Sequence, residues 1–89
     1  AHPFETVSPR EQAEEWLMMG LRLAEGVCIN DCKNLTGYNF DDLIDPRQFD
    51  LMQREEFLIY DQTTDILKTT AQGALCLNAI LGRIINDAL

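Results

Sequence analysis

The chain has 89 residues, of which 15 are acidic and 7 are basic, so its formal net charge at pH 7 is −8. This length provides one domain with a single modest hydrophobic core. The negative charge argues against nucleic-acid phosphates and anionic membrane surfaces as partners. No apolar run approaches the length of a membrane span, and no signal-peptide pattern is present.

The cysteine content favours a reducing compartment. Three cysteines fit reduced thiols better than a disulfide framework, so the sequence predicts a cytoplasmic protein. Residues 1–7 show little periodicity and are interpreted as a lead-in segment. Residues 8–89 are predicted to form one domain without repeats or inner linkers.

The first predicted helix covers residues 9–26. Ser8 can cap its start, Pro9 suits the first helical position, and Glu11 completes a capping box. Gly26 is typical of a helix stop.

The apolar residues of this helix cover an arc of roughly 200° on a helical wheel, wider than the stripe of an ordinary surface helix. The helix is therefore predicted to be central to the fold, to pack on something beyond the fragment, or both. Gly20 in mid-helix costs roughly 1 kcal/mol against alanine, which indicates close approach of another backbone element. Met18 stands among charged residues and has no evident core to join. The arc consists of Ala13, Trp16, Leu17, Met19, Gly20, Leu21, Leu23 and Ala24.

The middle of the chain predicts shorter helices. One covers residues 29–36, with Gly37 as its stop. A further helical region covers residues 39–54 and is interrupted at Pro46, where Asp45 can cap the restarted helix.

The last third of the chain predicts a hairpin and a helix. Strand-like runs at residues 57–60 and 65–69 flank a polar turn whose type the sequence leaves open. Thr70 caps a last helix over residues 71–86. The element order predicts a mainly α fold with a small β-hairpin, in a winged-helix-like arrangement. The apolar face of the last helix consists of Gly73, Ala74, Leu77, Ile80, Leu81, Ile84 and Ile85.

No catalytic, cofactor-binding or metal-ligating residue is predicted in this fragment. Cys28-x-x-x-Cys32 resembles a metal motif, but structural metal sites need four ligands and iron–sulfur clusters need at least three nearby cysteines. Leu35 occupies the position of the third cysteine in a C-x-x-x-C-x-x-C motif, and Cys76 is remote. The cysteines are interpreted as small buried apolar residues. His2, the only histidine, is interpreted as a solvated terminal residue.

A free-standing nucleic-acid-binding winged helix is an alternative from another class. The region around residues 45–54 would be the recognition helix, and its acidic residues would be repelled by phosphates, so no nucleic-acid partner is predicted. The charged residues in and just after that region are Asp45, Arg47, Asp50, Arg54, Glu55 and Glu56.

One long motif carries a family resemblance. It consists of Ser8-Pro9-x-Glu11 followed by Glu14-Glu15-Trp16-Leu17-Met18-Met19-Gly20-Leu21-Arg22-Leu23-x-Glu25-Gly26-Val27. It resembles the start of the C-terminal domain of the oxygen-independent coproporphyrinogen III oxidase family, which are radical S-adenosylmethionine (SAM) proteins. The part from Leu17 to Gly26 is most similar to the branch regarded as heme chaperones.

The resemblance extends over residues 8–85. Thr70-x-x-Gly73 resembles the family's Thr-Pro-x-Gly opening of the last helix, with Ala71 in place of proline. Glu55-Glu56 stands where a glycine-containing helix end is common.

The resemblance implies an accessory role for this fragment. The parent polypeptide would hold a 4Fe-4S cluster and S-adenosylmethionine in an upstream radical SAM barrel, and it would act on porphyrin or heme. Cys28 and Cys32 do not correspond to the cluster motif. The implied function lies in the heme chaperone branch, and the alternative is a true coproporphyrinogen III dehydrogenase that performs oxidative decarboxylation. The residues expected to dock on the barrel are Trp16, Met18, Gly20, Arg22 and Glu25.

Overall fold

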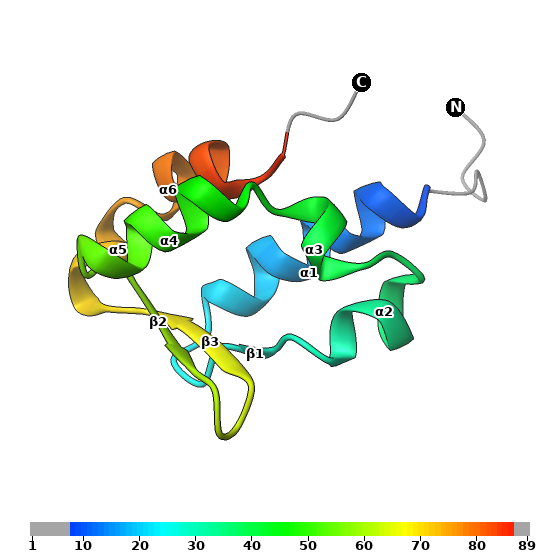
Figure 1. Cartoon of the computed structure of the whole chain (residues 1–89), viewed down its shortest axis with the longest axis horizontal. Helices are drawn as coiled ribbons and strands as arrows, with labels where there is room; N and C mark the ends of the chain where they lie inside the picture. Colours follow the sequence, from blue (N-terminus) through cyan, green and yellow to red (C-terminus); the bar gives the residue numbers. More distant parts are fainter. Residues whose placement is uncertain (1–7, 87–89) are drawn as a thin grey trace.

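The computed structural model describes residues 8–86, which form several helices and a small antiparallel sheet that lies at the lower side of the view in Figure 1. The sheet has the strand order β1-β3-β2. The helices are α1 (Pro9–Leu21), α2 (Asp31–Thr36), α3 (Phe40–Leu43), α4 (Pro46–Arg54), α5 (Ala71–Leu75) and α6 (Leu77–Ile84). The strands are β1 (Val27–Cys28), β2 (Leu58–Asp61) and β3 (Ile66–Thr69). The predicted mainly α, winged-helix-like fold with a β-hairpin is confirmed, while the lead-in segment and His2 lie outside the described residues.

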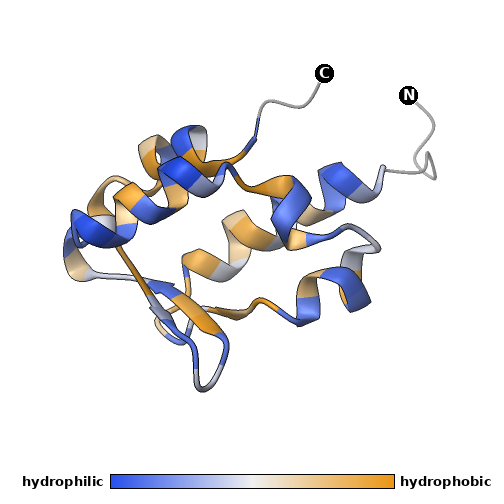
Figure 2. Cartoon of the chain, viewed as in Figure 1, coloured by the Kyte–Doolittle hydropathy of each residue, from blue (hydrophilic) through white to orange (hydrophobic). Residues whose placement is uncertain are grey.

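Helix α1 begins as predicted and supplies the central row of the core. The Ser8 side chain accepts a hydrogen bond from the Glu11 N–H at 3.2 Å, and the Glu11 carboxylate accepts one from the Ser8 N–H at 3.2 Å. Ala13, Leu17 and Leu21 lie on one stripe of the helix and are at most 1 % exposed. They join a cluster with buried side chains of α3, the sheet and α6, and Figure 2 shows hydrophobic residues where these elements meet.

Helix α1 ends at Leu21, so the predicted end at Gly26 is wrong. The Leu23 N–H bonds to the Gly20 carbonyl at 3.1 Å, and the Gly26 N–H bonds to the Leu23 carbonyl at 3.1 Å, so tight turns replace the helix. Gly26 has a φ of 72° and leads directly into β1.

Gly20 provides the space into which Val27 packs. A Cβ atom built on Gly20 would overlap Cγ1 of Val27. The close approach expected from the sequence is therefore present, but the neighbour is a side chain and not a backbone element.

Strand β1 was not predicted, and residues 29–30 do not begin the following helix. Val27 lies opposite Leu67, and Cys28 lies opposite Ile66. A strand of two residues is too short to show the alternation of apolar and polar residues by which a strand is recognised in a sequence. Helix α2 stops at Gly37, which has a φ of 79°, as predicted.

The interruption at Pro46 is confirmed. Asp45 caps α4 by accepting a hydrogen bond from the Arg47 N–H at 3.0 Å. At the other end of α4, the Glu56 N–H bonds to the Gln53 carbonyl at 3.1 Å, and the Phe57 N–H bonds to the Met52 carbonyl at 2.9 Å. This pair of bonds is a Schellman motif.

Glu56 occupies the left-handed position of that motif, with a φ of 63°. Glycine usually fills this position because it has no Cβ to clash. The structure thus gives a conformational reason for the glycine expected near residues 55–56 by family resemblance.

The predicted hairpin is confirmed as β2 and β3. Phe57 and Asp65, which were predicted as strand residues, flank the paired residues. Asp65 has a φ of 61°, and its N–H bonds to the Asp61 carbonyl at 2.7 Å across the turn.

The last helix is broken at Cys76, so the prediction of one continuous helix is wrong. The two pieces pack on different partners: α5 contacts β3, and α6 contacts α4. Ala74, predicted on the apolar face, is exposed. The C-terminal end of α6 is tied to the α3–α4 junction by a hydrogen bond of 2.7 Å from the Asp45 N–H to the Ile84 carbonyl.

The Thr70-x-x-Gly73 motif anchors α5 to the start of β2. The Thr70 hydroxyl accepts a hydrogen bond from the Gly73 N–H at 3.0 Å and donates one to the Glu56 carbonyl at 2.6 Å. A Cβ on Gly73 would overlap the carbonyl oxygen of Phe57. The glycine therefore permits a close approach of helix and strand backbones.

Gly20→Ala is predicted to destabilise the domain by about 1–3 kcal/mol, because overpacking against Val27 outweighs the helix preference of alanine. In a Val27→Ala background the same substitution is expected to be neutral or stabilising. Urea unfolding of the four proteins measures this difference. Equal effects of Gly20→Ala in both backgrounds would contradict the packing described here.

Glu56→Gly is predicted to stabilise the domain relative to Glu55→Gly by about 1–2 kcal/mol. The two substitutions remove the same charge and add the same backbone freedom to the unfolded chain. Of these two residues, Glu56 has a positive φ, whereas Glu55 has a φ of −82°. Indistinguishable urea midpoints for the two variants would argue against the left-handed conformation.

Candidate functional site

Two hollows lie on opposite flanks of α1. The first, here called the tryptophan groove, has a volume of about 400 Å³. Met19 and Leu23 beside it are 57 % and 53 % exposed, so the domain leaves these large apolar side chains in water. The groove is lined by Trp16, Met19, Gly20, Leu23, Gly26, Val27, Cys28 and Asp31.

Trp16 is held in this groove by a row of aromatic rings. Its ring meets Phe40 edge to face, with ring centroids 6.5 Å apart. Phe40 meets Phe49 in the same way at 5.7 Å, and Phe49 lies 6.4 Å from Tyr60. Such contacts restrict the orientations of the rings. Trp16 is half-buried, so part of a ring held in a fixed orientation remains at the surface.

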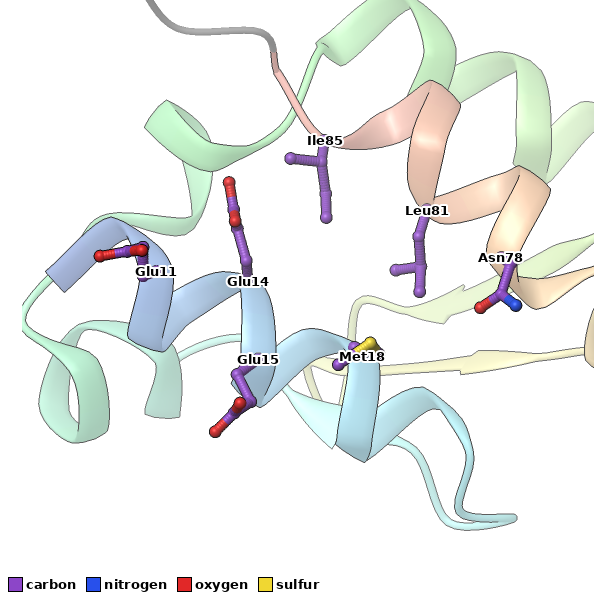
Figure 3. A pocket seen from close by; sticks show the side chains of 7 residues that line it. All are labelled: Glu11, Glu14, Glu15, Met18, Asn78, Leu81 and Ile85. Atoms are coloured by element: carbon purple, nitrogen blue, oxygen red, sulfur yellow. The ribbon is translucent and has the colours of Figure 1, made fainter. Parts of the chain in front are cut away.

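The second hollow, here called the α1–α6 groove, has a volume of about 560 Å³ (Figure 3). Met18 points across it toward Leu81 and Asn78, while Glu14 and Ile85 lie on opposite sides of its other end. Its lining residues are Glu11, Glu14, Glu15, Met18, Asn78, Leu81 and Ile85.

The prediction that Met18 has no core to join is wrong. Met18 is half-buried and packs against the core cluster, and Asn78 and Leu81 of α6 line the same hollow. The wheel of a single helix does not show which flank a distant helix covers.

The five residues predicted to dock on a barrel are not brought together. Trp16 and Gly20 line the tryptophan groove, whereas Met18 lines the α1–α6 groove. Arg22 and Glu25 are exposed in the turn that follows α1. Their docking role stays a prediction.

Met19 and Leu23 were not included among those docking residues. The sequence placed both in the wide apolar arc, and the width of that arc was the signal that some of its members stay uncovered. The core covers only the narrower row that contains Ala13, Leu17 and Leu21.

The cysteine pair does not form one site. Cys28 lies in β1, whereas Cys32 lies on α2. The Cys32 thiol is fully buried, donates a hydrogen bond to the Tyr38 carbonyl at 3.3 Å, and lies 3.8 Å from the Thr36 hydroxyl. Burial raises the pKa of the Cys32 thiol, which disfavours the thiolate that a metal would need.

The other two thiols each contact a different polar group. The Cys28 sulfur lies 3.9 Å from Asp65 Oδ2, and the Cys76 sulfur lies 3.5 Å from the Gln72 carbonyl oxygen. Among residues 8–86, no group of three or more His, Cys, Asp or Glu side chains is arranged to hold a metal ion. These residues therefore do not fit an iron–sulfur cluster.

Asp65 is a structural junction that sequence reasoning missed, because it was predicted as a strand residue. Its carboxylate accepts hydrogen bonds from the Tyr60 hydroxyl and, at 2.8 Å, from the Asn30 N–H. Its carbonyl accepts a bond from the Ile29 N–H at 2.9 Å. The hydrogen bond to Asp65 raises the pKa of Tyr60 because it holds the hydroxyl in its protonated form.

No helix within residues 8–86 has the length and apolar character needed to cross a membrane.

Comparison with known proteins identifies the family of this chain and a relative of it. Residues 7–77 match the family model described as the HemN C-terminal domain. The Dictyostelium discoideum protein named "Radical S-adenosyl methionine domain-containing protein 1, mitochondrial" is 37 % identical over 76 residues. The aligned part covers 84 % of this chain and 17 % of that relative, so the chain spans less than a fifth of the relative's length. No solved structure matches the chain.

Proposed function

The chain belongs to the HemN C-terminal domain family, and from this premise we propose that it is the accessory C-terminal domain of a radical SAM protein of porphyrin or heme metabolism. The similarity to a relative named for its radical SAM domain supports this parentage. The motif from Leu17 to Gly26, in the second half of α1 and the turn after it, favours the heme chaperone branch over the true coproporphyrinogen III oxidases.

We assign the cofactors of the reaction to the upstream barrel of the parent. The described thiols are buried or paired with other groups and do not fit a cluster, so the 4Fe-4S cluster and S-adenosylmethionine would be held elsewhere. When bound there, they supply radical chemistry. This chain contributes packing and coverage and no reacting group.

The exposed apolar side chains of the tryptophan groove carry the proposal that this domain docks on the barrel. Met19 and Leu23 each leave more than half of their surface in water, beside the supported ring of Trp16. Burying apolar surface gains roughly 25 cal/mol per Å². An aromatic anchor in such a groove is typical of the centre of a protein interface, with Arg22 and Glu25 suited to its polar rim.

We assign the binding site for porphyrin or heme to another part of the parent and not to the α1–α6 groove of this domain. Porphyrins of this kind carry carboxylates, and three glutamates rim the α1–α6 groove. Like charges placed opposite one another disfavour binding. The cytoplasmic location stays a prediction, since the Dictyostelium relative is named as mitochondrial.

Heme binding by the full-length parent tests the proposed branch. We expect the anaerobically reconstituted parent to show cluster absorbance, to bind added heme with a shifted Soret band, and to leave coproporphyrinogen III unchanged. Oxidative decarboxylation of coproporphyrinogen III without heme binding would assign the parent to the true oxidases. A parent without an upstream C-x-x-x-C-x-x-C motif and without cluster absorbance would overturn the radical SAM assignment.

A further inference from the structure

The α1–α6 groove continues beyond the hollow shown in Figure 3. A second hollow of about 300 Å³ shares Glu14, Leu81 and Ile85 with it and extends to Gly82 and Arg10. Because they share lining residues, the two hollows together form one groove between α1 and α6. Its apolar floor consists of Met18, Leu81 and Ile85.

Gly82 in α6 has no packing reason within the described residues. A Cβ built on Gly82 would meet no atom within 4 Å. Gly20 and Gly73, by contrast, each make space for Val27 or the Phe57 backbone. A glycine inside a helix costs about 1 kcal/mol against alanine. A partner that approaches the backbone closely at Gly82 would account for this cost.

The charge of the groove is negative. The Glu11 carboxylate accepts a hydrogen bond from the Ser8 N–H in the capping box, and Glu14 forms an ion pair with Arg10 at 3.1 Å. Glu15 has no ion pair within residues 8–86. Among the described residues that line the groove, Arg10 is the one cation, and it also donates hydrogen bonds to the Tyr38 hydroxyl and the Asn86 carbonyl. The three carboxylates on α1 therefore outweigh it, and a cationic partner is favoured.

The walls of the groove favour a helical partner. The walls are formed mainly by α1 and α6, whose backbone groups bond within their own helix, and Ile85 just beyond α6 already pairs with Ile44. They therefore offer little to the backbone of an extended peptide. A helix satisfies its own backbone groups and inserts apolar side chains at i, i+3, i+4 and i+7 into a groove. Gly82 would allow such a helix to lie close to α6.

We propose that the α1–α6 groove docks an amphipathic α-helix of a partner, with aliphatic residues on one face flanked by Lys or Arg. The aliphatic face contacts Met18, Leu81 and Ile85 and passes over Gly82. The basic residues pair with the glutamates of α1. This surface lies on the flank of α1 opposite the tryptophan groove and does not depend on the parentage proposed above.

Titration with designed peptides tests this inference. One probe is a helical peptide of about 15 residues with Leu at the groove-facing positions and Lys elsewhere, and its partner probe has Glu in place of Lys. We expect only the Lys peptide to shift the amide NMR signals of Met18, Leu81, Gly82 and Ile85. Added salt should weaken this binding.

Two variants of α6 separate groove binding from general attraction to an acidic domain. Gly82→Leu fills the groove without changing the net charge and should weaken binding by about tenfold or more. Ala79→Leu adds bulk to the side of α6 that faces α4 and should leave the dissociation constant unchanged. Thermal unfolding should show that both variants remain folded.

Three results would overturn the proposal. The first is equal binding of the Lys and Glu peptides or of neither. The second is wild-type affinity in the Gly82→Leu variant, which would indicate unspecific electrostatic association. The third is peptide-free dimerisation that Gly82→Leu abolishes, which would assign the groove to a second copy of this chain.

Discussion

The contact between Val27 and Gly20 determines how the sheet meets α1. Because residue 20 has no Cβ, β1 can lie directly against the helix, and the chain must leave the helix at Leu21 to reach that position. Gly26 then turns the chain with a left-handed φ, and Val27 pairs opposite Leu67. The fully buried Leu67 joins the core row of α1 through this arrangement. The missing side chain at residue 20 thus allows β1 to lie close to α1.

The same arrangement leaves α1 with two surfaces besides its core face. A small domain buries only a limited share of its apolar surface, and here the core takes the narrow row that ends at Leu21. One flank keeps Met19 and Leu23 exposed beside Trp16, and the other forms a groove with α6. Both proposed docking surfaces therefore lie on the helix that supplies the central row of the core. These surfaces differ in chemistry, since the first is apolar and the second is rimmed by carboxylates.

Local signals in the sequence predicted much of this fold. The capping box at Ser8, the stop at Gly37 and the interruption at Pro46 each depend on neighbouring residues, and all three are present. Features that depend on distant contacts were missed. The early end of α1 requires the pairing of β1 with β3, and the break at Cys76 accompanies packing of α5 and α6 on different elements.

The candidate site was predictable only in part, because it too depends on contacts between residues distant in the sequence. The width of the apolar arc showed that α1 carries more apolar surface than a small core can cover. It did not show which flank α6 would occupy, so Met18 was grouped with Trp16 although the two line different grooves. The family could be recognised because its motif lies almost entirely within α1 and the turn after it.

Hydroxyl-radical footprinting of this chain alone and within its full-length parent tests the central claim that one flank of α1 is covered by a partner domain. Mass spectrometry would compare oxidation of Met19 and Leu23 with that of Leu35, which is 65 % exposed on α2, and of Met52, which is 5 % exposed. We expect oxidation of Met19 and Leu23 to fall several-fold in the parent, while Leu35 stays reactive and Met52 stays protected in both. Equal oxidation of Met19 and Leu23 in the two proteins would contradict the claim.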